Sequence, residues 1–161
     1  MNTFQKALAA ATFAATAVFA SPALAQDTPP VVVVGEVKAV EVTVDDSGNE
    51  VERLVDLGFT LPGTRLVYVR KFTNTTGEPI RNFVLTNPLS PQVRLGPDAD
   101  EGLQVSVDGG STFASLAELS VTEEDGAQRT ASHSDVTHIR WTIEVIEPGQ
   151  SGQVQFPAII R

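Results

Sequence analysis

The sequence predicts an all-β domain, a two-sheet sandwich of seven to nine antiparallel strands. Apolar, β-branched runs alternate with Gly, Pro, Asn and Asp clusters roughly every ten residues, the spacing typical of sandwiches. A helical apolar period is absent throughout. The clearest example lies at Leu66–Leu89, where two apolar runs flank a short polar break.

The two runs in Leu66–Leu89 predict strands joined by a turn. Tyr68 and Phe83 belong to these strands, and we expect both in the core because aromatic residues pack well on pleated surfaces. The break at Asn74–Gly77 supplies a turn, in which Asn74 can bond the local backbone and Gly77 can take a positive φ.

The first 25 residues predict a signal peptide. Lys6 precedes the apolar run Ala7–Ala20, and Ala23-Leu24-Ala25 forms a small-x-small cleavage site. Cleavage between Ala25 and Gln26 would place the protein in the periplasm or outside the cell, with no membrane span left. The alternative, an uncleaved anchor, is disfavoured because the run is short of the ~20 residues that a span needs.

Composition narrows the function classes. Removing 25 of 161 residues leaves a 136-residue chain, the size of one domain. The chain has no cysteine, which excludes a disulfide scaffold. Without Lys6, the chain has 10 of its 11 basic residues and 20 acidic ones, so its net charge is strongly negative. This charge argues against nucleic acid or an anionic membrane as partner.

The predicted domain covers residues 31–161, after a short leader at 26–30. Its first half contains a long valine-rich strand at Val31–Val44, with a bulge expected near Gly35 or Ala39 because the alternation slips there. The short return strand is Val51–Val55.

The second half begins with Ser90–Gly102, a segment without a strand pattern. Four further predicted strands follow it: Leu103–Val107, Thr112–Leu119, His138–Ile146 and Val154–Ile160. Alternation in His138–Ile146 places Trp141 on the apolar face of that strand, where we expect it to fill the core.

A set of short motifs resembles a known bacterial family. The motifs are Pro62-Gly63, Tyr68, Asn74-Thr75, Asn82, Asn87-Pro88-Leu89, Trp141-Thr142-Ile143 and Pro148–Ser151. In order and spacing they are similar to the conserved-repeat domain known as domain of unknown function eleven. The resemblance implies an immunoglobulin-like sandwich in an envelope, surface or secreted protein. This chain departs from the family at two positions: Asn87 stands where the family commonly has an aspartate, and Arg70 stands where it favours an aliphatic residue. An arginine that points inward at this position needs a partner or a bulge.

A second resemblance is local. Ser106-x-Asp108-x-Gly110-x-Thr112-Phe113 matches the Asp-box of sialidases and other carbohydrate-active β-proteins. The Asp carboxylate can accept backbone N–H bonds, the glycines can take unusual φ values, and the aromatic residue can pack beneath. We interpret these five residues as a structural hairpin turn, with glycan contact as the alternative; a propeller would repeat the motif blade by blade.

Other candidate sites are weaker. His133, Asp135 and His138 contain metal-ligating groups, but an extended strand would point them to different faces. A catalytic triad of Ser111, His138 and Asp135 lacks the sharp turn that exposes such nucleophiles. The acidic loop residues Asp98, Asp100 and Glu101 lack the spacing of a calcium loop, so at most a weak calcium contact is expected.

These observations leave three hypotheses. The leading one is an exported, non-catalytic structural or protein-interaction module of the cell envelope, without a cofactor, which binds an unknown protein or envelope component through a strand edge or loops. The second is a carbohydrate-binding module that uses the Asp-box region. The third is a small enzyme or metalloprotein.

Overall fold

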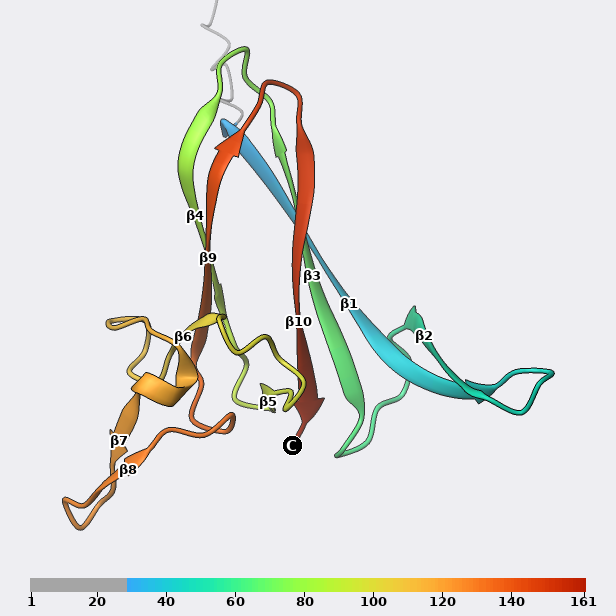
Figure 1. Ribbon diagram of the computed structural model, residues 1–161, viewed down its shortest axis with the longest axis vertical. Coiled ribbons are helices and arrows are strands. Elements are labelled where there is room, and N and C mark those ends of the chain that lie inside the picture. The colour runs from blue at the N-terminus through green and yellow to red at the C-terminus, as the bar shows by residue number, and fades with distance from the viewer. Residues whose placement is uncertain (1–28) are drawn as a thin grey trace, which may run out of the picture.

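The computed structural model describes residues 29–161, so the predicted signal peptide and cleavage site lie outside the described residues. As predicted, the domain is an all-β sandwich of antiparallel strands (Figure 1), but the described residues form ten strands and not the expected seven to nine. The larger sheet has the order β2 (Glu50–Asp56), β1 (Val31–Val44), β3 (Arg65–Asn74), β10 (Ser151–Ile160), β5 (Val93–Leu95). The smaller sheet has the order β4 (Ile80–Pro88), β9 (His138–Ile146), β6 (Gln104–Ser106), and β7 (Ser120–Thr122) pairs with β8 (Gln128–Thr130).

The core lies between the larger and the smaller sheet of the sandwich, where the apolar side chains of their inner faces meet. Phe156 of β10 is its centre: the ring stacks on Tyr68 at 4.8 Å and lies 5.9 Å from Trp141 of the opposite sheet. Tyr68 and Trp141 are themselves half-buried against this core. Phe83 is half-buried against a second cluster formed by Val31, Phe72 and Ile146.

The strands on either side of Asn74–Gly77 belong to different sheets. β3 pairs with β1 and β10, whereas β4 pairs with β9, so the turn carries the chain across the sandwich. Gly77 is not among the glycines with positive φ, contrary to expectation. The Asn74 side chain shapes the turn instead: its Oδ1 accepts bonds from the N–H and hydroxyl of Thr76, and its Nδ2 donates to Glu78 O.

Three short strands lie where the sequence shows no strand pattern. β5 falls within Ser90–Gly102, and β7 and β8 lie in the polar stretch before β9. Conversely, Thr112–Leu119 is not a strand. Ala114 makes only an isolated bridge, and a 3-10 helix, η1 (Leu116–Glu118), follows because Glu118 Oε2 accepts bonds from both the N–H and the hydroxyl of Ser115.

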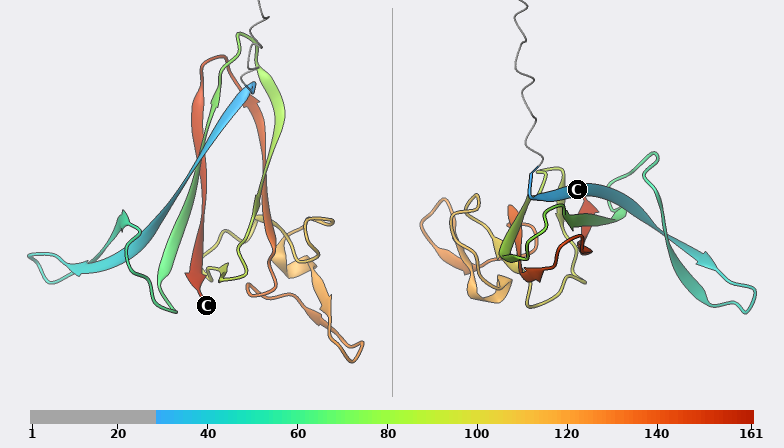
Figure 2. Two further views of the ribbon diagram at one scale, coloured as in Figure 1. Left: turned by 180° about the vertical axis from the view of Figure 1, so that it is seen from behind. Right: turned by 90° about the horizontal axis from the view of Figure 1, so that it is seen from above.

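β1 lies between two strands that pair with different parts of its length. On one edge Val31–Ala39 pairs with β3, and on the other edge Lys38–Val44 pairs with β2. Because β2 follows only the second part of β1, the hairpin Lys38–Asp56 projects from the sandwich; we call it the arm. Figures 1 and 2 show the arm and the β7–β8 hairpin on opposite sides of the same end of the molecule.

The valine-rich strand contains no bulge. The pairing of β1 with β3 runs without a break through Gly35 and Ala39, so the expected bulge is wrong. Arg70 does lie on the inward face of β3, in continuous register with β1 and β10, and it has the partner that such a position needs: its Nε donates to Asn87 Oδ1 at 2.7 Å.

Candidate functional site

The turn Ser106–Phe113 is tied together around one carboxylate. Asp108 Oδ1 accepts bonds from the Ser106 hydroxyl at 2.7 Å and from the N–H groups of Ser111 and Thr112 at 3.0 and 2.9 Å. Its Oδ2 accepts the Thr112 hydroxyl at 2.6 Å. Gly109 and Gly110 take positive φ values of 78° and 92°, which only glycine adopts without strain. The polar groups of the motif therefore satisfy one another's hydrogen bonds within the turn.

The turn is also held against the smaller sheet. Ser106 is fully buried, and its hydroxyl accepts the Gly110 N–H at 2.9 Å. The Arg140 guanidinium lies 4.1 Å from the centre of the Phe113 ring, within the range of a cation–π contact. The aromatic residue of the motif is thus covered by a cation, and the carboxylate is engaged by its own turn. This geometry supports the structural interpretation of the Asp-box residues.

Asp108 should make the stability of the protein depend on acid pH. The hydrogen bonds from Thr112, and then from Ser106 and Ser111, hold the pKa of the Asp108 carboxyl well below its usual range. A folded-state pKa below the unfolded value, about 3.9, gives stability that is fully present above that pH and is lost as the pH falls through the folded-state pKa.

We therefore expect Asp108→Asn to lower the melting temperature at neutral pH, and the difference from wild type to shrink below about pH 4. NMR titration of the Asp108 carboxyl carbon measures the pKa directly. A titration midpoint at or above the usual aspartate value would contradict the prediction.

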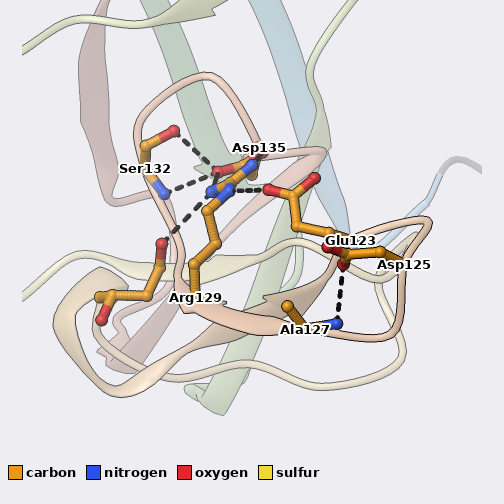
Figure 3. Close-up of polar contacts among 7 residues, drawn as sticks. Glu123, Asp125, Ala127, Arg129, Ser132 and Asp135 are labelled. Carbon is orange, nitrogen blue, oxygen red and sulfur yellow. Dashed lines mark hydrogen bonds and ion pairs between the residues drawn. The ribbon is translucent and has the colours of Figure 1, made fainter.

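A second carboxylate is held beside the β7–β8 hairpin. In Figure 3, Arg129 lies between Glu123 and Asp135, and it donates to both Asp135 oxygens at 2.7 and 2.9 Å. Ser132 donates to Asp135 through its N–H and its hydroxyl, both at 2.7 Å. Arg129 above all, and then Ser132, lower the pKa of Asp135. This network fixes the turn that leads into β9.

The candidate metal and catalytic residues do not form a hydrogen-bonded triad. Asp135 is engaged by Arg129, while His138 Nδ1 lies 3.1 Å from the Thr137 hydroxyl and the Ser111 hydroxyl donates to Asp108 O. Of the acidic loop residues, Asp98 pairs with Arg65, and Asp100 accepts the Gly102 N–H. Across residues 29–161, no group of three or more potential ligands is placed to hold a metal ion.

An open cleft of ≈ 780 Å³ lies at the end of the sandwich that carries η1. Its walls are mainly apolar, with Leu95, Val105 and Leu116 among them, and Asp100, Glu101 and His133 line it as well. Such walls suit a ligand. Two serines of the lining donate their hydroxyls to carboxylates, Ser115 to Glu118 and Ser132 to Asp135, and these bonds belong to the start of η1 and to the turn before β9.

The arm presents the more unusual surface. Val42, Val44 and Leu54 share one of its faces and are half or more exposed, Val44 at 67%. The loop after β2 adds Phe59, which is 93% exposed. Sequence reasoning missed this surface, because alternation identifies an apolar face but does not say whether another layer covers it.

The arm is also acidic. Lys38–Asp56 contains six acidic residues and two basic ones. Two of the acidic groups are paired, Asp56 with Lys38 and Glu52 with Arg65 of β3. The register places Glu50 and Glu52 beside Val44 and Val42 on the exposed apolar face, and Asp45 and Asp46 lie in the turn beyond it, whereas Glu41 and Arg53 lie on the opposite face. Acidic groups therefore form a negative rim along the apolar residues of the arm.

Comparison with known proteins adds no relatives. No family model matches the chain, and neither a curated protein nor a solved structure is significantly similar to it. Within residues 29–161, no helix has the length and apolar character needed to cross a membrane.

Proposed function

We propose that this protein is an exported, non-catalytic interaction module of the bacterial envelope, acting in the periplasm or outside the cell, and that it binds a protein partner through the arm. The observation that carries the proposal is the projecting face of Val42, Val44 and Leu54, which the sandwich leaves uncovered. Exposed apolar patches with polar rims are typical of protein interfaces. The signal-peptide pattern and the resemblance to the conserved-repeat domain support an exported location.

The charge of the arm indicates the charge expected on the partner's binding surface. An acidic rim around an apolar centre is complementary to an apolar surface flanked by Lys or Arg, and such complementarity favours association and correct register. Neutral and acidic glycans offer no such cation.

The test is affinity purification from envelope and culture fractions of the producing bacterium, with wild type and the double variant Val42→Ser/Leu54→Ser as baits. We expect the variant to fold normally, because surface substitutions change stability by only about 0.5 kcal/mol. It should retain at least tenfold less of one specific protein.

Ala117→Ser provides the control, because it adds a hydroxyl at an exposed position of η1, away from the arm. If wild type and the arm variant retain the same proteins in the same amounts, the arm is not the interface.

A further inference from the structure

A second unpartnered region lies at the other end of β1. The Val31–Val37 part of β1 has β3 on one side and, within the described part of the chain, no strand on the other. β4 is the edge of the smaller sheet. Figure 1 shows β2 beside only the far part of β1, so this part of its edge stays free. Free strand edges are templates for pairing with another chain.

A cleft of ≈ 270 Å³ opens between these two edges; we call this region the open flank. Val33 of β1 lies on one side and Phe83–Thr86 of β4 on the other, with Arg70 in the lining. A bulk water occupies about 30 Å³, so the cleft has room for several waters or for a side chain. Val33 and Val84 are half-exposed beside it.

Arg70 is held by an amide and not by a carboxylate. No described carboxylate lies within 4.0 Å of its guanidinium, in contrast to Arg65 and Arg129, which form ion pairs. Its strong hydrogen bond uses only Nε, and its Nη1 lies 3.5 Å from Val69 O, at the limit of hydrogen-bond length. Arg70 Nη2 has no hydrogen-bond partner, and no buried polar side-chain atom in the described residues lacks one, so Nη2 is accessible to solvent in a residue that lines the cleft.

The arginine is held in this position from both sides. Asn87 is buried, and its Nδ2 donates to Pro88 O at 2.9 Å, which orients Oδ1 toward Arg70. On β1 the guanidinium lies over Gly35: a Cβ at that position would be 1.9 Å from Arg70 Nη1. Gly35 therefore leaves the space that the cation occupies. A half-buried guanidinium prepared in this way suits a carboxylate, which accepts two parallel N–H bonds.

We propose that the open flank binds an extended acidic segment of a partner protein. The backbone of that segment pairs with the free edge of β1, and one Asp or Glu side chain reaches Arg70. Strand addition supplies backbone hydrogen bonds, and the arginine supplies specificity for a carboxylate. Arg70 makes the flank positive where the arm is negative, so this inference goes beyond the arm and is independent of it.

Calorimetry with defined probes tests the proposal on the mature chain. The first probe is an eight-residue peptide of alternating valine and threonine with one central glutamate, the second is its glutamine counterpart, and the third is sodium acetate. The glutamate peptide should bind wild type at least tenfold more tightly than the glutamine peptide does. It should also bind far more tightly than acetate, because acetate cannot pair with a strand.

Two variants connect that preference to the open flank. Arg70→Gln should abolish the preference for glutamate, and Gly35→Ala should weaken it because the added methyl group displaces the guanidinium. Arg81→Gln removes an equal charge from an exposed position of β4 and should leave the preference intact. The two-peptide comparison on wild type and the Gly35→Ala result keep the test decisive even where Arg70→Gln fails to fold.

Three results would overturn the proposal. They are equal binding of the two peptides to wild type, a glutamate preference that survives in folded Arg70→Gln, and acetate binding as strong as that of the glutamate peptide. Dimerisation of the protein that depends on Arg70 would assign the open flank to a second copy of this chain and would likewise overturn the proposed occupant.

Discussion

Phe156→Ala is expected to lower the free energy of unfolding by about 3–5 kcal/mol, the usual cost of truncating a buried phenylalanine. The Phe156 side chain is 1% exposed and lies between the sheets, stacked at 12° on Tyr68 and tilted toward Trp141. Removing the ring eliminates both aromatic contacts and leaves a cavity that two facing sheets cannot close without shifting.

Chemical denaturation followed by fluorescence measures this effect, because Trp141 is the single tryptophan and touches the truncated ring. Phe59→Ala is the matched control: it removes the same side chain from a 93% exposed position and should change stability by less than about 0.5 kcal/mol. Equal unfolding midpoints for the two variants would show that Phe156 is not central to the core.

The long strands could be predicted from the sequence because each carries several cycles of alternation. Strand β9, for example, repeats its apolar face from Ile139 through Trp141 to Ile143. β5 has only three residues, too few for a period, and it forms because β10 offers an edge that Val93 and Leu95 can join while burying their side chains. Such a strand is defined by its neighbour more than by its own residues.

The misassigned strand at Thr112–Leu119 had a readable signal. Ser115-Leu116-Ala117-Glu118 is a capping-box sequence, and this local pattern prevails over the apolar residues that suggested a strand. The Asp108 turn could be predicted for a similar reason, since the hydrogen bonds of the Asp108 carboxylate all come from residues within four positions.

The surfaces proposed for binding were beyond such local reasoning. The sequence shows that an inward Arg70 needs a partner, but Asn87 is 17 residues away and in the other sheet. The role of Gly35 depends on the register of β1 against β3. The exposure of the arm depends on which strands lack a neighbour, and that follows from the complete topology.

Asn74→Ala is the second substitution with a large expected effect, about 2–4 kcal/mol of lost stability. Asn74 is fully buried, and every polar atom of its side chain is used. Nδ2 donates to Glu78 O at 2.8 Å and to Ile146 O at 2.9 Å, while Oδ1 accepts the N–H and hydroxyl of Thr76. Its own N–H donates to Gln150 O, so Asn74 joins the β3–β4 turn to the β9–β10 turn.

Alanine would leave the buried carbonyl of Ile146 and the part-buried N–H of Thr76 without these partners, and an unsatisfied buried group costs about 1–3 kcal/mol. Thr75→Ala is the control, because the neighbouring threonine is exposed and, among residues 29–161, its hydroxyl donates only to the carbonyl groups of Pro29 and Pro30. Thermal and urea unfolding should therefore separate the two variants clearly. Amide hydrogen exchange should also accelerate at Thr76 and Gln150 in Asn74→Ala, because both turns lose the side chain that holds them together. Unchanged exchange at both positions, with stability equal to that of Thr75→Ala, would show that the two turns form without this asparagine.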